Sequence, residues 1–289
     1  MTELSKKPVR DQAEHNAYFP SAYSLAAYTS PVSDFAGYQN EPVATAKKYK
    51  VLLVGTDERY LQMKNGKYFS TGNHPIETLL PLMHLHHVGF EIEVATLSGN
   101  QVKFELWALP KEDQAVMDFY HELLPKLEAP AKLADLLPQV EAKDSPYVAV
   151  FFPGGHGALL DLPESKEVKQ VLQWAMANEK KIVTLCHGPA ALLAAANEND
   201  ETDFLFAGYE MTVFPDSLDE GANIDIGYLP GQLKWLLGER LEKLGVKVIN
   251  QDVTGQVHKD RNVLTGDSPA AANKLGILAT QELLADLDN

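Results

Sequence analysis

Cys186, the single cysteine of this 289-residue chain, lies where an apolar run meets a turn. The run KIVTL at residues 181–185 has the short, continuous apolar character of a strand that is covered on both faces. His187, Gly188 and Pro189 follow it, and proline is favourable near the first position of a helix. The pattern predicts a sharp strand-to-helix turn that presents the thiol at the carboxyl edge of a sheet, as a nucleophile elbow does.

A thiol at such a turn has two interpretations. The positive end of the helix dipole would stabilise a thiolate and lower its pKa, and free backbone N–H groups would bind a developing oxyanion. A lone intracellular cysteine is, however, more often a buried and inert packing residue. The position of Cys186 at the turn favours the reactive interpretation.

A glycine pair follows another apolar run. In FFPGGHGALLDL, residues 151–162, Gly154 and Gly155 come directly after a predicted strand and permit positive φ and close backbone approach. They predict an oxyanion hole opposite the thiol, and an ordinary turn is the alternative. The segment lacks the lysine of a phosphate-binding loop, so it gives little support to nucleotide binding.

The elements that must position these residues alternate between strand and helix patterns. Strands are predicted at 50–56, 90–97, 147–155, 181–185 and 246–250, with helices at 75–89, 168–180, 188–196 and 233–245, and a strand and a helix close the chain. Such alternation predicts an α/β fold with a mostly parallel sheet and helices on both faces.

Two segments depart from this alternation. Residues 1–47 are polar and rich in Tyr, Pro and Ser, and they predict an N-terminal arm before a core of residues 48–289. Residues 98–146 carry several prolines among helical patches, and they predict an inserted cap that helps to enclose a site.

Composition excludes several classes of function. The chain has 40 acidic and 25 basic residues, a net charge of −15, which repels phosphate backbones and anionic membrane surfaces. Its apolar runs are too short to span a membrane, and its first residues show no signal-peptide core. A single cysteine cannot form an internal disulfide. We expect a soluble, cytoplasmic protein with no nucleic-acid-binding basic patch and no membrane partner.

Longer motifs resemble a known family. PGGHGALLDL and TLCHGPAALL together resemble the ThiJ/PfpI superfamily, whose members share a flavodoxin-like sheet and a cysteine on the elbow. FSTGNHPIETLLPLMHLHHVGFEIEVATLSG, VFPDSLDEGANIDIGYLPG and TGDSPAAANKLG are similar to the HchA class within it, the class of a bacterial heat-shock chaperone, glyoxalase III and deglycase. The resemblance covers most of the chain and implies a doubly wound flavodoxin-like core and a homodimer.

The resemblance implies roles for four residues. Cys186 would be the nucleophile with His187 beside it, Asp216 the carboxylate that orients the histidine, and Glu77 an acid and base near the sulfur. Glu77 falls in the first turn of the helix predicted from Pro75, which suits the carboxyl edge of the sheet, and a nearby thiolate would raise its pKa. Taken alone, Glu77 is more typical of a helix-start charge and Asp216 of a turn residue.

The resemblance also raises the question of a metal. His86 and Glu91 match two positions of a site with two histidines and one carboxylate in the HchA class, but the third position aligns with Leu123. His121 lies two residues away, and two residues along a helix turn a side chain by about 200°. Zinc is therefore possible, as a structural or regulatory ion separate from the thiol chemistry, with His121 as the uncertain third ligand. No cofactor is expected for catalysis.

The implied function is a glutathione-independent glyoxalase that converts methylglyoxal to lactate. A hemithioacetal would form on Cys186, Gly155 would stabilise the oxyanion, and Glu77 and His187 would move protons. The same site would act on glycated proteins and nucleotides as a deglycase, in a stress-related role. The alternatives are a heat-inducible holding chaperone for unfolded proteins and a cysteine peptidase or amidase, although the chain has no His-x-Glu pair of the amidotransferase type.

Overall fold

The computed structural model of the chain describes residues 3–196 and 203–287. Within these residues the largest sheet has seven strands in the order β12-β13-β9-β8-β3-β6-β7. Its strands are β3 (Lys50–Val54), β6 (Glu91–Thr96), β7 (Ala131–Lys132), β8 (Tyr147–Phe152), β9 (Lys181–Leu185), β12 (Val257–Asp260) and β13 (Val263–Gly266). Neighbours pair in parallel except β12, which is antiparallel to β13. The predicted mostly parallel α/β sheet is confirmed.

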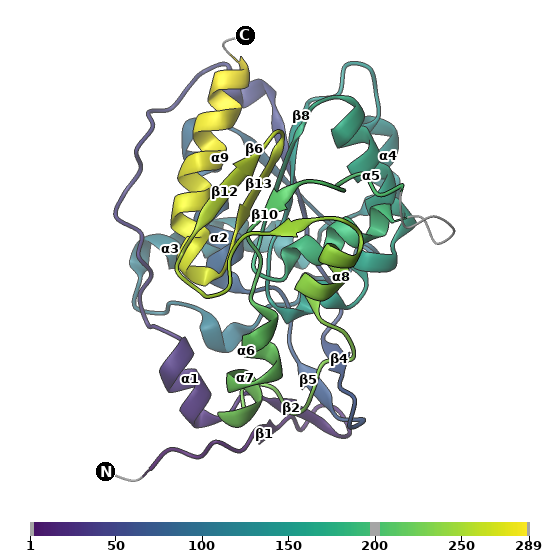
Figure 1. Ribbon diagram of the computed structural model, residues 1–289. Coiled ribbons are helices and arrows are strands. Elements are labelled where there is room, and N and C mark those ends of the chain that lie inside the picture. The colour runs from purple at the N-terminus through teal and green to yellow at the C-terminus, as the bar shows by residue number, and fades with distance from the viewer. Residues whose placement is uncertain (1–2, 197–202, 288–289) are drawn as a thin grey trace.

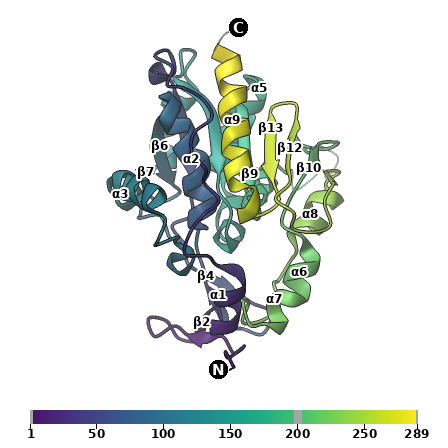
Figure 2. The same cartoon turned by 90° about the vertical axis from the view of Figure 1, so that its left-hand side faces the viewer.

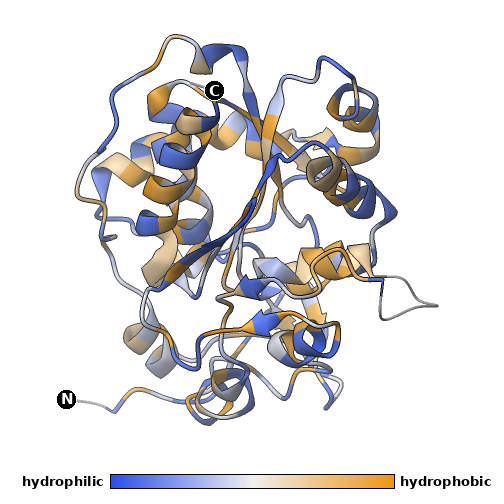
Figure 3. Ribbon diagram, turned by 45° about the horizontal axis from the view of Figure 1, so that its top comes forward, coloured by the Kyte–Doolittle hydropathy of each residue, from blue (hydrophilic) through white to orange (hydrophobic). Residues whose placement is uncertain are grey.

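Helices cover both faces of this sheet, as Figure 1 shows. The helices on one face are α2 (Pro75–Val88), α3 (Gln114–Glu128) and α9 (Ala272–Leu287), and those on the other are α4 (Leu133–Val140), α5 (Lys166–Ala177) and the 3-10 helix η5 (Gly188–Ala195). Figure 3 shows hydrophilic and hydrophobic residues together on several helices of the fold, as on amphipathic helices that bury one face.

Two-sided burial explains the unbroken apolar strands. In β3, Leu52 and Val54 pack with the face of α4 and α5, whereas Val51 and Leu53 pack with the face of α2 and α9. Because successive side chains of a strand point to opposite faces, a strand covered on both faces is apolar at most positions and not only at alternate ones. The sheet is thereby fixed as the rigid support of the turns at its carboxyl edge.

Residues 98–146, expected as a cap, contribute one strand and two helices to the core. Strand β7 adds to the edge of the sheet in parallel with β6, α3 packs against α2, and α4 packs against α5. Pro125 and Pro138 lie inside α3 and α4 without ending them. Of residues 98–146, all of which the structure describes, Glu105 is the one that lines the cavity discussed below.

The helix-strand unit expected at 233–250 is shorter and lies outside the main sheet. The helix α8 covers Leu237–Lys243, and β11 (Lys247–Val248) pairs with β10 (Glu210–Met211) in a separate two-stranded sheet. The position beside β13 is taken by β12, which forms a hairpin with it. The next parallel place in the sheet is therefore blocked.

The N-terminal arm forms a small second layer with residues 60–70. Its elements β1 (Val9–Arg10), β2 (Ala17–Phe19) and α1 (Ala22–Tyr28) join β4 (Tyr60–Gln62) and β5 (Tyr68–Ser70), whose strands form a sheet in the order β1-β2-β5-β4. Figures 1 and 2 show this layer at one end of the main sheet, together with α6 (Asp216–Glu220) and α7 (Ala222–Asp225). The carboxyl edge of the sheet is thus covered by segments distant in sequence.

Short 3-10 helices complete the described elements: η1 (Ala46–Lys48), η2 (Leu106–Ala108), η3 (His156–Leu159), η4 (Leu162–Glu164) and η6 (Pro269–Ala271). None of the helices in residues 3–196 and 203–287 combines the length and the apolar composition that crossing a membrane requires.

Candidate active site

Cys186 occupies the turn between β9 and η5 with a left-handed backbone, φ 57°. This conformation costs a non-glycine residue about 1–3 kcal/mol and persists where the surroundings hold it. Here the Cys186 N–H donates to the Gly266 carbonyl at 2.8 Å, and its own carbonyl accepts from the Phe214 N–H at 3.0 Å. The side chain is 5% exposed and lines a cavity of about 370 Å³. The expected elbow is formed, and the thiol borders an open cavity.

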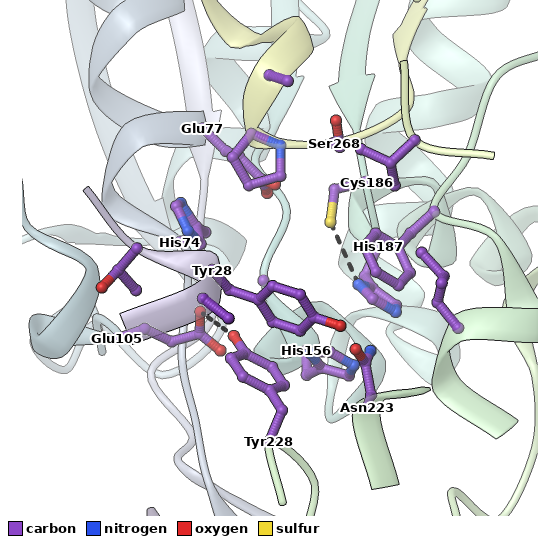
Figure 4. Close-up of a pocket in the computed structure, with 18 residues that line it drawn as sticks. Tyr28, His74, Glu77, Glu105, His156, Cys186, His187, Asn223, Tyr228 and Ser268 are labelled. Carbon is purple, nitrogen blue, oxygen red and sulfur yellow. Dashed lines mark hydrogen bonds between the residues drawn. The ribbon is translucent and has the colours of Figure 1, made fainter. Parts of the chain in front are cut away.

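His187 is placed to accept the thiol proton. Its Nδ1 lies 3.3 Å from the Cys186 sulfur, and its Nε2 lies 2.7 Å from Oδ2 of Asp219 (Figure 4 shows the first contact). Because a carboxylate only accepts hydrogen bonds, Nε2 carries the hydrogen and Nδ1 presents a lone pair to the sulfur. Burial, together with the neighbouring charge of His156, lowers the pKa of His187, so the ring is held neutral.

The carboxylate that orients His187 is Asp219, and the expected contact of Asp216 is wrong. Asp216 accepts hydrogen bonds from the backbone N–H groups of Gly238 and Glu239, both at 2.8 Å, and so caps the start of α8. Asp219 lies one helical turn further along and is 3% exposed. The sequence offered both carboxylates within PDSLD, and the packing of α8 decides between them.

Asp219 binds a second histidine as well. Its Oδ1 accepts from His156 Nε2 at 2.9 Å and from Asn223 Nδ2 at 2.7 Å. Burial alone would raise the pKa of Asp219, but His156 and His187 outweigh it and hold the pKa well below its usual range. The carboxylate is therefore ionised and fully hydrogen-bonded, which fixes both imidazoles.

Glu77 approaches the sulfur from the first turn of α2, as expected. Its side chain is fully buried, and its carboxyl group interacts with the Cys186 thiol and the Gly155 amide. Among the described residues neither carboxylate oxygen has a hydrogen-bond partner of ordinary geometry. Figure 4 shows the sulfur between Glu77 and His187. A proton can therefore leave or reach the sulfur from either side.

The two glycines have different tasks. A Cβ on Gly154 would collide with the Glu77 carboxylate and would lie 2.7 Å from Cys186 Cβ, so this position leaves the acid and the thiol room to meet. Gly155 has φ 94°, and its N–H lowers the pKa values of both Glu77 and Cys186, so it lies near both groups. Gly155 is thus the member of the pair that offers a donor to a developing oxyanion.

Burial, and not the helix dipole, dominates the electrostatics of the thiol. Burial and then the charge of Glu77 raise the pKa of Cys186 well above its ordinary value, and burial also raises the pKa of Glu77. This direction is opposite to the lowered pKa expected from the helix dipole. Two acids that share one buried cavity cannot both ionise, so the pair titrates as a unit. At rest the sulfur is protonated, and attack requires a base.

Residues that the sequence did not single out close the cavity. Tyr28 of α1 contacts Tyr228 edge-on with ring centroids 5.6 Å apart, and the Tyr228 hydroxyl lies 3.5 Å from Glu105. Burial raises the pKa of Glu105 and lowers that of His74, which also lines the cavity, to about 3. His156 could have been noticed, since it follows the glycine pair in PGGHG, whereas Glu105 and Tyr228 belong to no local pattern.

The expected metal ligands do not converge. His86 Nε2 lies 3.1 Å from Glu122 Oε1, and Glu91 pairs with Lys50 at 3.3 Å and with Lys126 at 3.8 Å. His121 is exposed on α3, and in residues 3–196 and 203–287 no group of three ligand atoms within 4.8 Å includes His86, Glu91 or His121. These residues do not fit a zinc site in this arrangement.

Comparisons with known proteins relate the whole chain to one family. Residues 68–215 match the model of the DJ-1/PfpI family. The chain is 59% identical over 282 residues to the protein/nucleic acid deglycase HchA of Pseudomonas aeruginosa (strain UCBPP-PA14), covering 98% of this chain and 97% of the relative. It is 54% identical over 289 residues to the HchA deglycase of Staphylococcus aureus (strain JH9), covering 100% and 98%. Glyoxalase III from Candida albicans shares the fold, with a TM-score of 0.64 at 23% identity over 81% of this chain and 98% of that one.

Proposed function

The chain belongs to the DJ-1/PfpI family, and on that premise we propose that it is a cofactor-independent glyoxalase and a protein and nucleotide deglycase. Its substrates would be small α-oxoaldehydes such as methylglyoxal, and glycated proteins. The observation that carries the proposal is the chain of contacts from Cys186 through His187 to Asp219, beside the buried Glu77. These groups supply a nucleophile, a base for its proton and a second proton carrier.

The first step needs His187 as the base. As the sulfur bonds to the aldehyde carbon, Nδ1 of His187 accepts the thiol proton and the carbonyl electron pair moves to oxygen. The Gly155 amide stabilises the developing oxyanion. The proton then passes from His187 to that oxygen, which gives a hemithioacetal on Cys186. A thiol that is protonated at rest can react in this way because its base lies within hydrogen-bonding reach.

Glu77 carries out the second step. Its carboxylate removes the hydrogen of the hemithioacetal carbon to give an enediol and returns it to the neighbouring carbon, while the hydroxyl proton passes from the first oxygen to the second. The product is a thioester of a 2-hydroxy acid, which water hydrolyses to lactate and the free thiol. Because burial raises the pKa of Glu77, this carboxyl group holds a proton more readily than an ordinary carboxyl group and can return it to the substrate.

Deglycation would enter the same sequence. An early adduct of an amine with methylglyoxal carries the nitrogen on the former aldehyde carbon. Attack by Cys186 there forms the S–C bond, breaks the C–N bond and returns the amine with the thiol proton, which leaves the same hemithioacetal. The thiol is 5% exposed at the wall of a cavity, a position that suits small adducts on flexible side chains better than the peptide bonds of a folded chain.

Lactate formation from methylglyoxal without glutathione tests the proposal. We expect Cys186→Ala and Glu77→Gln each to lower the rate by about 100-fold or more, the usual contribution of an acid or base. His84→Gln is a matched control, because His84 is a buried histidine of α2 that bonds Asn273 and does not line the cavity. Wild-type rates in both Cys186→Ala and Glu77→Gln would remove the mechanism.

A holding chaperone is the second candidate function, and an apolar groove between the arm and η2 favours it. Val9, Phe19, Leu25 and Leu106 line this groove, and Val9 and Leu106 are about half exposed. Suppression of the aggregation of a heated protein should then survive in Cys186→Ala and weaken in Leu106→Asp. Loss of suppression in Cys186→Ala alone would tie the activity to the thiol and reject the groove.

A further inference from the structure

His156 stands beside His187 on the same carboxylate, yet the steps above give it no task. We propose that His156 is a positioning residue, a positive charge held by Asp219 and Glu105 that keeps His187 neutral with its Nδ1 lone pair toward the thiol. Only the kinetic test of this inference rests on the proposed function, because the protonation states of the His156 and His187 rings can be measured without turnover.

The packing leaves His156 little freedom. The residue is 3% exposed, and its ring lies 3.9 Å from the ring of His187, centroid to centroid, at an angle of 35°. Its Nε2 is bonded to Asp219 at 2.9 Å, and the rings of Phe69 and Tyr228 lie 5.5 and 5.8 Å away. Any charge on His156 is thus held against one face of His187.

The groups around His156 favour that charge. The titratable groups that face it are Asp219 of α6, Glu105 before η2, His187 at the start of η5, His74 at the start of α2, and Tyr228 after α7. Burial alone would lower the pKa of His156, but the negative charges of Asp219 and Glu105 outweigh it, so the pKa is raised. The same carboxylate therefore supports one charged ring and one neutral ring.

His187 experiences the opposite balance. Burial first, and then the charge of His156, lower its pKa, and Asp219 and the more distant Asp216 offset this only in part. A charged His187 would direct an N–H at the sulfur and could not accept the thiol proton. His156 thus preserves the base at pH values where an ordinary histidine, with a pKa of about 6.5, begins to take up a proton.

His156→Gln tests the charge separately from the hydrogen bond, because the glutamine amide can still donate to Asp219 near the position of Nε2. We expect the acid limb of the kcat/KM profile for methylglyoxal to move up by about one pH unit, since His187 would take a proton more readily. Alkylation of Cys186 by iodoacetamide should move the other way, toward lower pH, because a protonated His187 stabilises the thiolate. Cys186 is the only cysteine, so the label reports one site.

The opposite directions of the two profiles distinguish this role from simple support of the structure. A structural defect would lower both amplitudes and leave both inflections in place, and this result in a folded His156→Gln variant would overturn the proposal, as would two shifts in the same direction. His84→Gln, the same substitution at a buried histidine outside the cavity, should leave both profiles unchanged. If the glyoxalase proposal fails, the alkylation profile still decides the inference.

A measurement on the wild-type protein covers the case in which the variant does not fold. Nitrogen NMR of labelled histidines, assigned with His187→Gln, should find His156 charged and His187 neutral with its hydrogen on Nε2 at about pH 6. A neutral His156 beside a charged His187 at that pH would overturn the proposal.

Discussion

Replacing Asp219 by asparagine should disable His187 by reversing its tautomer. Oδ1 of Asp219 accepts from His156 at 2.9 Å and from Asn223 at 2.7 Å, whereas Oδ2 accepts only the 2.7 Å bond from His187 among the described residues. The amide oxygen of the variant will therefore stay toward the two donors, and its NH₂ group will face His187. Because two donors repel, His187 must carry its hydrogen on Nδ1, where it can no longer accept the thiol proton.

The expected losses are large in both activity and stability. A wrong tautomer in a nucleophile–histidine–carboxylate relay lowers the rate by about 10²–10⁴, so kcat/KM for lactate formation should fall by that factor. His156 also loses the buried charge with which it pairs, and breaking such a pair costs about 3–5 kcal/mol. For a chain of this size the midpoint of thermal unfolding should drop by about 10 °C. Initial rates and thermal unfolding curves measure the two effects.

Asp216→Asn is the matched control, with the same substitution one helical turn away. Asp216 accepts one backbone hydrogen bond on each carboxylate oxygen, from Gly238 and from Glu239, and the variant would lose one of them. The expected cost is about 1 kcal/mol, the usual value of a helix cap, with kcat/KM near that of the wild type. If Asp216→Asn were inactive and Asp219→Asn active, the reasoning about the relay would be refuted.

Three further changes test the cavity and the expected metal site. Glu77→Gln should raise the midpoint of thermal unfolding above that of the wild type at about pH 8 and lose this advantage below about pH 4. A carboxyl group whose pKa is raised on folding costs stability as the pH rises from its unfolded pKa to its folded pKa, and the glutamine removes this cost. An advantage of the variant that grew toward acid pH would contradict this sign. Gly154→Ala should lower kcat/KM by about tenfold or more, since its Cβ would collide with the Glu77 carboxylate and lie 2.7 Å from Cys186 Cβ, and a wild-type rate would show that the two groups need no clearance. Dialysis against a chelator should leave lactate formation unchanged, and elemental analysis should find no stoichiometric zinc, because His86 and Glu91 are paired with other side chains. If the protein held stoichiometric zinc and His86→Ala removed it, these ligands would have to rearrange on binding the metal.

The sequence indicates the main sheet because its central strands, such as β3 and β8, are buried on both faces and are therefore mostly apolar. The small sheet is different: β1 has two residues and β2 three, and strands this short show no periodicity. They are ordered because β2 pairs with β5, which in turn pairs with β4, and no local sequence pattern predicts such long-range pairing. In the segment 98–146 the prolines obscure the helical pattern, although Pro125 and Pro138 are accommodated inside helices.

The candidate site, like the fold, can be predicted from local sequence only in part. Cys186, His187 and the glycine pair are parts of two continuous motifs at strand ends, so their convergence follows from the parallel sheet. Asp219 could not be separated from Asp216 in this way, because the position of α8 determines which carboxylate is left for His187. Tyr28 of the arm and Glu105 before η2 reach the cavity through long-range packing, which no local sequence pattern predicts.

Burial explains both why the resting thiol of Cys186 holds its proton and why the site can still react. The elbow that points the sulfur of Cys186 at the cavity also removes it from water and places it beside Glu77, and both effects favour the protonated thiol. A protonated thiol is a poor nucleophile toward passing reagents. It becomes a good one when an electrophilic carbonyl lies against it and His187 can take its proton in the same step. The thiol therefore becomes reactive when a substrate occupies the cavity. The hydrogen bond between His187 and Asp219 makes this possible, because it keeps the Nδ1 lone pair of His187 directed at the sulfur before any substrate arrives.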